Sequence, residues 1–290
     1  YDEAVKPDLY FCGFGVSDYD DFNIESLPYA GKTAAGVSAA LERLEGKGFD
    51  TVHTALFTEG EVTASAIEQA KRMAAGAGVD DTVIIYISGH GVGLSTEKGG
   101  EYYFIKKDTR LADIEQTGIP YSKLEEIFDN TPARNRLLFL DTCESGEDFA
   151  GSGDGAMVAA AARDDLIPMD LGRRVVRQTL PDAVQWTNRE DRYIFNPVGS
   201  SGGIVRFSAA QGNERAWMDP KLQRSVFGEM IIRAFSGRRA DADGNGVISK
   251  TELTEFVSKE VISYTEQAPS VQHPTIDRDN LYAKIEFGIR

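Results

Sequence analysis

Short apolar runs and amphipathic stretches alternate along the first third of the chain. Apolar and aromatic residues predict strands over 9–16, 49–57 and 83–87, because runs of this length between glycine or polar residues suit buried strands. Residues 30–47 and 62–75 carry apolar positions at helical spacing and end at glycines, so each predicts a helix. This strand-helix-strand-helix-strand order predicts an α/β fold, with a parallel sheet and helices on both of its faces.

The pattern is less regular after residue 100. Residues 102–105 predict a short strand or hairpin arm, residues 120–129 a third helix, and residues 137–140 a fourth strand. The stretch from 147 to about 200 is rich in glycine and arginine, and we expect an exposed, mobile connection there. Beyond it, the sequence predicts a core strand, two helices and a last edge strand, at 204–209, 226–235, 252–264 and 281–289.

Charge narrows the classes of partner. The 290 residues include 31 Lys and Arg against 46 Asp and Glu, which gives a formal net charge of −15. This balance argues against nucleic acid and favours basic partners. No apolar run approaches the roughly 20 residues that span a bilayer, and the first residues lack a signal-peptide pattern. We therefore expect a soluble, cytoplasmic protein without membrane contact. The start at Tyr1 suggests either a domain cut from a longer chain or a processed product.

The chain has two cysteines, Cys12 and Cys143, too few for a disulfide framework. Cys12 lies inside the first predicted strand, where we expect a small buried apolar side chain. Cys143 follows the fourth predicted strand, in the stretch Asp141-Thr142-Cys143-Glu144-Ser145-Gly146. We expect no bridge between the two.

A histidine follows the third predicted strand as Cys143 follows the fourth, in the motif Ser88-Gly89-His90-Gly91. If the two strands are neighbours in a parallel sheet, His90 and Cys143 meet at its carboxyl edge. A cysteine attacks as thiolate, and a histidine within hydrogen-bond reach supplies the base that it needs. The amides of Gly91 and Cys143 could then form an oxyanion hole. Taken singly, each residue also fits a role without catalysis: the cysteine as a structural residue and the histidine as a solvated one.

The paired motifs, 143 − 90 = 53 residues apart, resemble those of the caspase-like cysteine peptidases of clan CD, family C14. The resemblance is greatest to the prokaryotic caspase-homologue and metacaspase branch, and it extends from the opening LYFCGFGVSDY to about Glu252. It implies a caspase-like α/β/α sandwich with a mostly parallel central sheet. It also implies a large (p20-like) subdomain over residues 1–150, a basic connection over 151–200 and a small (p10-like) subdomain over 201–290.

The same resemblance implies roles for single residues. Cys143 would be the nucleophile and His90 the general base and acid of a Cys-His dyad that hydrolyses peptide bonds. Asp141 would line the pocket for the side chain before the scissile bond, which in metacaspase-like members prefers Arg or Lys. Two positions depart from the pattern: Glu144 stands where many relatives have histidine, and Thr33 where relatives often have a second pocket aspartate. A strand-end carboxylate that caps nearby amides remains the alternative for Asp141.

A second motif lies over residues 241–252, with the sequence DADGNGVISKTE. It matches the twelve-residue calcium loop of EF-hands, with a turn glycine at Gly246 and Ser249 at the ninth position. The predicted ligands of Ca²⁺ are Asp241, Asp243, Asn245, the carbonyl of Val247 and Glu252. Such loops usually occur in pairs and this one is alone, so two interpretations stay open. Either the loop binds calcium and braces the small subdomain, or its Asp and Gly residues serve only turns and caps.

The arginine-rich connection suggests self-processing, because family members are often cut between their large and small subunits. The candidate cleavage sites are Arg163, Arg173, Arg174 and Arg177. A solvated basic loop is the alternative.

We therefore expect a cysteine endopeptidase that cleaves protein or peptide substrates, with basic ones preferred, and that needs no cofactor for catalysis. A catalytically silent homologue serving as a scaffold or sensor module is the rival from another class. An active peptidase preferring an uncharged residue is a third hypothesis. Relatives are often fused to repeat or sensor domains, so we also expect a fused or associated domain of that kind.

Overall fold

A six-stranded sheet forms the centre of the computed structural model, which describes residues 6–96, 99–143, 163, 165–171, 203–211, 214–276 and 285–290. The strand order is β13-β9-β7-β3-β1-β2, and all neighbours are parallel except β13, which pairs antiparallel with β9. This arrangement confirms the predicted α/β class. The strands are β1 (Leu9–Gly15), β2 (Val52–Thr58), β3 (Thr82–Ser88), β7 (Asn135–Asp141), β9 (Ile204–Ser208) and β13 (Thr275–Ile276).

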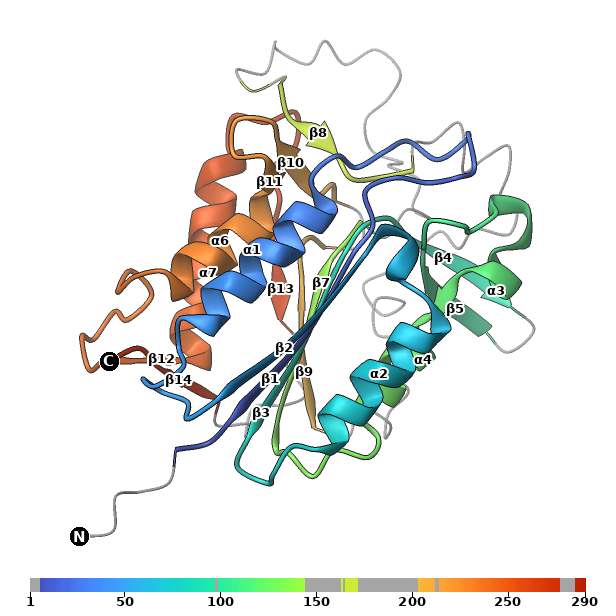
Figure 1. Cartoon of the computed structure of the whole chain (residues 1–290). Helices are drawn as coiled ribbons and strands as arrows, with labels where there is room; N and C mark the ends of the chain where they lie inside the picture. The colour runs from blue at the N-terminus through green and yellow to red at the C-terminus, as the bar shows by residue number, and fades with distance from the viewer. Residues whose placement is uncertain are drawn as a thin grey trace, which may run out of the picture.

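Helices cover both faces of this sheet (Figure 1). The helices α1 (Ala30–Glu42), α6 (Val226–Phe235) and α7 (Lys250–Thr265) gather on one face. The helices α2 (Ala64–Ala75) and α4 (Tyr121–Glu125) lie on the other face. The three-layered sandwich that the sequence implied is therefore present in the described residues.

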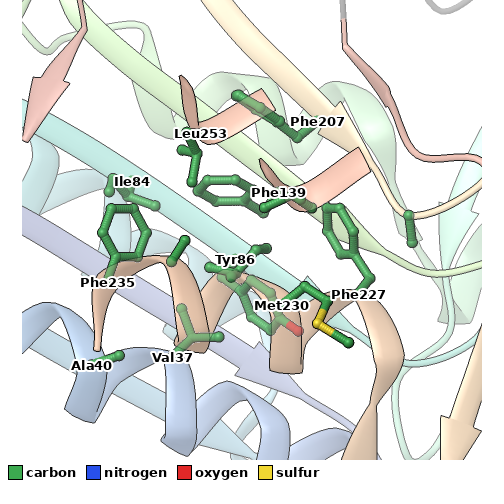
Figure 2. Close-up of a cluster of buried hydrophobic side chains, with 14 of the residues drawn as sticks. Val37, Ala40, Ile84, Tyr86, Phe139, Phe207, Phe227, Met230, Phe235 and Leu253 are labelled. Carbon is green, nitrogen blue, oxygen red and sulfur yellow. The ribbon is translucent and has the colours of Figure 1, made fainter. Parts of the chain in front are cut away.

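Alternating side chains of the central strands supply a core on each face. On β3, Ile84 and Tyr86 point into the cluster with α1 and α6, whereas Ile85 and Ile87 enter the cluster with α2. Every residue of β3 is buried, which explains why its sequence is a continuous apolar run rather than an alternating one. Figure 2 shows Phe139, between Phe207 and Tyr86, within the first of these clusters.

Among the described residues, three smaller sheets lie around the central one. One sheet has the strand order β4-β5-β6, with β4 at Gly91–Thr96, β5 at Gly99–Phe104 and β6 at Ile119–Pro120. The helix α3 (Ile114–Thr117) precedes β6 in the chain. The order β11-β10-β8 consists of Arg224–Ser225, Trp217–Asp219 and Ile167–Pro168. The pair β12-β14 consists of Val247–Ser249 and Glu286–Gly288. Single turns of 3-10 helix complete the described elements, at Glu59–Glu61, Leu111–Asp113 and Glu126–Phe128.

Two regions differ from the sequence-based expectation. Residues 165–171, expected in an exposed connection, include the strand β8 and the buried side chains of Leu166, Met169 and Leu171. Their apolar residues are too few for a strand pattern. Leu166 and Met169 join the large core, and Leu171 joins a smaller cluster with Val92 and Tyr103. The last predicted strand was placed over 281–289, and its described part, β14, pairs with β12 rather than with the central sheet.

Residues 204–208 and 275–276 complete the same sheet that residues 9–15 begin, so both ends of the chain share one core. Within the described ranges, no helix has the length and apolar character needed to cross a membrane.

Candidate active site

Neighbouring parallel strands bring the two motifs to one edge of the sheet. β3 and β7 pair in parallel with Ser88 opposite Asp141. His90 comes two residues after Ser88, and Cys143 two residues after Asp141. A main-chain hydrogen bond also links the two strand ends, because the Gly89 N–H donates to the Asp141 carbonyl at 3.4 Å. The edge predicted from the two apolar runs is therefore the edge that carries both residues.

The imidazole of His90 is enclosed by main chain. Its exposed fraction is 1%, with Nδ1 2.9 Å from the Met169 carbonyl and Nε2 2.8 Å from the Glu25 carbonyl. Burial lowers the pKa of His90, against the raising effects of these two carbonyls and of the charge on Asp170. A neutral imidazole carries one N–H, so it can donate to only one of the two carbonyls. The other nitrogen then faces an oxygen without a proton between them.

A tyrosine fixes the loop that carries His90. The main-chain N–H of His90 donates to the Tyr19 hydroxyl at 3.0 Å, and that hydroxyl donates to the Val16 carbonyl at 3.0 Å. The rings of Tyr19 and His90 lie 5.1 Å apart between centroids. Tyr19 thus ties the end of β1 to the histidine loop.

The thiol of Cys143 is also enclosed. Its exposed fraction is 3%, and Sγ accepts the Ala216 N–H at 2.9 Å while lying 3.8 Å from the Ala216 carbonyl. Burial raises the pKa of Cys143 well above its usual range, and the charge of Asp170 raises it further. Cys143 is therefore a protonated thiol at neutral pH in this arrangement.

One small assembly supplies the groups that touch both side chains. We call residues 166–171 the covering segment. Its Met169 N–H donates to the Ala216 carbonyl at 3.0 Å, and β8 within it pairs with β10. Arg215 Nε donates to Asp170 at 2.7 Å, so an ion pair joins the segment to the residue beside Ala216. The contacts on His90 and Cys143 are thereby linked.

Asp141 lies at the end of β7 with no exposed surface. Its Oδ2 accepts from the Tyr86 hydroxyl at 2.5 Å, from the Ser88 hydroxyl at 3.0 Å and from the Ser225 hydroxyl. Its Oδ1 is buried and without a hydrogen-bond partner. Burial raises the pKa of Asp141 to about 6, against the lowering effect of the three hydroxyl groups.

Thr33 lies next to this cluster. Its hydroxyl donates to the Tyr29 carbonyl at 2.7 Å and accepts the Ser225 N–H at 3.0 Å. Ser225 therefore contacts both Thr33 and Asp141. Close packing fills the space around them, because a Cβ at Gly228 would lie 2.2 Å from the Thr33 side chain.

Gly91, a predicted oxyanion-hole residue, begins β4 beside Tyr102. A Cβ at Gly91 would lie 2.0 Å from the Tyr102 hydroxyl, so only glycine fits here. That hydroxyl donates to the Thr142 hydroxyl at 2.7 Å. Tyr102 thus holds the residue after His90 close to the residue before Cys143.

The remaining sequence-based candidates lie elsewhere. Arg163 donates its N–H to the Gln267 carbonyl at 3.0 Å, forms ion pairs with Asp165 and Asp219, and lies over the Tyr264 ring. Glu144 lies outside the described residues, as do three of the candidate cleavage sites, Arg173, Arg174 and Arg177. The other candidate cluster, in residues 241–252, follows α6 and continues into the first turn of α7.

Cys12 and Cys143 are both buried and free, and they lie in the cores on opposite faces of the sheet. Sequence reasoning missed the residues that contact His90, Cys143, Asp141 and their neighbours, namely Tyr19, Glu25, Tyr102, Met169, Ala216 and Ser225. Glu25, Met169 and Ala216 act through their main chain, which every residue type has, so no sequence signal marks them. Tyr19 and Tyr102 lie outside both motifs in the sequence, so apart from their aromatic character no signal links them to the site.

Comparison with known proteins places this geometry in a family. The family model for the caspase domain, Peptidase C14, matches residues 14–285. Protein GSU0716 from Geobacter sulfurreducens superposes with a TM-score of 0.58 at 16% identity, over 96% of this chain and 97% of that one. Caspase-1 from Spodoptera frugiperda gives a TM-score of 0.51 at 13% identity, over 94% of this chain and 86% of its own. A comparison with curated protein sequences found no match.

At these identities the two structures establish the fold, and the family model extends the likeness to nearly the whole sequence. His90 and Cys143 both lie within the matched residues. The chain therefore belongs to the caspase-domain family, Peptidase C14, whose members are in general cysteine peptidases.

Proposed function

We propose that this chain is a cysteine endopeptidase in which Cys143 is the nucleophile and His90 the general base and acid. The observation that carries the proposal is their equivalent position, each two residues beyond the paired strand ends Ser88 and Asp141. A cysteine and a histidine at the same edge of a caspase-family sheet are the two groups that acyl transfer needs.

The proposed reaction has two stages. His90 takes the Cys143 proton, and the thiolate attacks the scissile carbonyl carbon while the amides of Gly91 and Cys143 donate to the developing oxyanion. His90 then gives its proton to the leaving amine as the C–N bond breaks, which leaves a thioester on Cys143. Water, deprotonated by His90, hydrolyses the thioester, and the proton on His90 returns to the thiolate that leaves.

The arrangement described above is, in this proposal, a resting state. Both ring nitrogens of His90 face carbonyls, and Sγ of Cys143 accepts the Ala216 N–H. Substrate can reach Cys143 only after the covering segment and Ala216 move. Desolvation then decreases, so the pKa of Cys143 falls towards its ordinary value and the thiol can give its proton to His90.

We further propose a preference for Arg or Lys before the scissile bond. The support is Asp141, a buried carboxylate with one unpartnered oxygen and a pKa raised by desolvation. A cation stabilises a buried carboxylate of this kind, so a substrate guanidinium would be favoured beside Asp141 once the packing around it opens. Thr33 supplies no second charge, so Asp141 alone would carry the preference over an uncharged side chain.

Self-processing after an arginine remains part of the proposal, with Arg163, Arg173, Arg174 and Arg177 as candidates. At Arg163 the ion pairs with Asp165 and Asp219 would have to break first. Intact mass after incubation, for wild type beside Cys143→Ala, tests the idea. Fragments in wild type alone support self-cleavage, whereas equal fragmentation of both contradicts it.

Covalent trapping tests the nucleophile. A peptidyl acyloxymethyl ketone ending in Arg should alkylate Cys143 of wild type and release its carboxylic acid, so in peptide mass spectrometry the peptide that contains Cys143 should gain the inhibitor mass less that of the acid. Cys12→Ala is the matched control and should label like wild type, because Cys12 is buried on the other face of the sheet. Labelling that persists in Cys143→Ala, or none in any protein, would contradict the proposal.

A catalytically silent scaffold or sensor is the second candidate, and the enclosure of both dyad side chains favours it. The two candidate functions predict different effects of moving the covering segment away from Cys143. A peptidase gains turnover when the covering segment is loosened, whereas a silent homologue changes only its binding to partners.

A further inference from the structure

We infer that residues 241–252 form a calcium site and that the C-terminal strand β14 takes the place of the second loop with which such loops are usually paired. This inference concerns a site apart from the dyad and holds whether or not the chain is a peptidase. It depends on the ligand set, on one unpartnered buried oxygen, and on the way the loop is held.

The acidic side chains of the loop converge. Asp241, Asp243 and Glu252 each offer a carboxylate oxygen, and these oxygens all lie within 4.8 Å of one another. Three negative groups at this separation repel one another in the absence of a cation. Carboxylate oxygens are hard ligands of the kind that Ca²⁺ prefers.

Asp241 gives independent support. Its exposed fraction is 7%, and its Oδ1 is buried without a hydrogen-bond partner. Its Oδ2 accepts the Gly246 N–H at 3.0 Å, which fixes the carboxylate within the turn. A buried carboxylate oxygen without a donor is costly, and a bound cation would remove that cost.

The backbone adopts the conformation that the motif requires. Gly244 and Gly246 have φ of +73° and +88°, in the left-handed region that favours glycine. Glu252 occupies the twelfth position and also closes the capping box of α7, since its side chain accepts the Ser249 N–H at 2.9 Å. The last ligand is therefore held at the first turn of a sixteen-residue helix.

Strand pairing braces the loop from the other side. Residues 247–249 form β12, which pairs antiparallel with β14, and Ile248 lies opposite Phe287. Both side chains have no exposed surface, and the Phe287 ring lies 4.8 Å from that of Phe235 between centroids. The loop is thus attached to the main core through β14. A single loop held in this way does not need a second one for its shape.

Isothermal titration with CaCl₂ on the full chain, together with thermal unfolding, tests the inference. Wild type should bind one Ca²⁺ with a Kd of about 1 mM or tighter. Glu252→Gln should weaken binding at least about 100-fold, because even outer-shell partners of a metal contribute 10- to 100-fold to affinity. Glutamine can still close the capping box, so the variant should fold.

Glu255→Gln is the matched control, since Glu255 is exposed on the same helix and outside the loop. It should bind like wild type. Asp243→Asn is the second variant, because asparagine keeps an oxygen for the Asn245 N–H while losing one charge. It should weaken binding about tenfold or more.

Three results would overturn the inference: no saturable binding of Ca²⁺ up to about 10 mM, equal affinity in wild type and a folded Glu252→Gln, or Mg²⁺ binding as tightly as Ca²⁺. The melting temperature should rise with Ca²⁺ equally in wild type and in Glu255→Gln, less in Asp243→Asn and least in Glu252→Gln. A rise of the same size in Glu252→Gln would place the ion elsewhere.

Discussion

The dyad edge and the 241–252 loop are assembled in opposite ways. The ring of His90 contacts the carbonyls of Met169 and Glu25, which are 79 and 65 positions away along the chain. The Sγ of Cys143 accepts the N–H of Ala216, which is 73 positions away. In the loop, Gly246 donates to Asp241 over five positions, and the Glu252 carboxylate accepts from residues up to ten positions away. The placement of His90 and Cys143 is therefore a product of sheet topology, whereas the carboxylates of the loop are positioned mainly by local sequence.

Burial differs in the same sense. His90, Cys143 and Asp141 are almost fully enclosed, so desolvation dominates their ionisation. The loop exposes Asp243 and half-exposes Glu252. Substitutions at the dyad edge should consequently act through protonation and access, whereas substitutions in the loop should act locally on backbone and ligand. The four predictions below test that division, from the largest expected effect to the smallest.

Replacing the base should have the largest effect. His90→Asn should lower peptide turnover about 100- to 10,000-fold, the usual contribution of a general acid and base. His53→Asn is the matched control, because His53 lies in the edge strand β2 and pairs with Asp8 at 3.0 Å. Turnover and melting temperature are measured for both. Equal turnover of His90→Asn and His53→Asn would remove His90 from the reaction.

The second prediction concerns Asp141 and pH. Its pKa in the folded protein is raised from 3.8 to about 6, so the folded state disfavours the charged form. Wild type should therefore lose stability as pH rises from about 4 through 6, by on the order of 3 kcal/mol for about two pKa units. Asp141→Asn lacks this titration, so its stability relative to wild type should increase over that range. Urea unfolding at pH 4, 5, 6 and 7.5 measures the difference, and a difference independent of pH would contradict the account.

The third prediction concerns the covering segment. Iodoacetamide should alkylate Cys143 slowly at pH 7.5, because its raised pKa and burial leave little accessible thiolate. Arg215→Gln breaks the ion pair with Asp170 and should speed alkylation about fivefold, if the pair contributes about 1 kcal/mol to closure. Arg110→Gln, which breaks an exposed pair with Asp113, is the control.

Alkylation is followed by mass spectrometry of the peptide that contains Cys143, with buried Cys12 as an internal reference. Burial also raises the pKa of Cys12, to about 12, so both thiols should start slow. Acceleration at both cysteines in Arg215→Gln would indicate general unfolding rather than local opening. Equal rates in Arg215→Gln and Arg110→Gln would show that the ion pair does not hold the site closed.

The smallest effects should come from two loop glycines. Gly244→Ala should lower the free energy of unfolding by about 1 kcal/mol, since alanine disfavours the left-handed region and no atom lies within 4 Å of its Cβ. Gly246→Ala should cost more, because its Cβ would lie 2.3 Å from the Arg290 side chain, which must move. Denaturant unfolding compares the pair, and alkylation of Cys143 should be unchanged in both.

Much of the fold was predictable because long apolar runs fix long elements. The helix α6 has the bounds that the sequence predicts, and β3 and β7 differ from prediction only by one or two residues at their ends. The two-residue and three-residue strands β8, β10, β11 and β12 were not predictable. Their pairing depends on tertiary neighbours, and two or three residues carry no periodic signal.

The candidate site also has parts that the sequence predicts and parts that it does not. His90 and Cys143 could be placed at one edge because each follows a buried strand. Their enclosure could not be predicted, because Met169, Glu25 and Ala216 contact them through main-chain groups. For Asp141 the sequence placed the carboxylate but not the hydroxyl groups of Tyr86, Ser88 and Ser225 that surround it.

The most direct test of the central claim is hydrolysis of four fluorogenic peptides that differ only in the residue before the scissile bond: Arg, Lys, Asp or Leu. Wild type and Cys12→Ala should cleave the Arg and Lys peptides and leave the other two, whereas Cys143→Ala should cleave none. Turnover that survives in Cys143→Ala, or no turnover by wild type on any peptide, would contradict the claim that Cys143 and His90 form a working dyad.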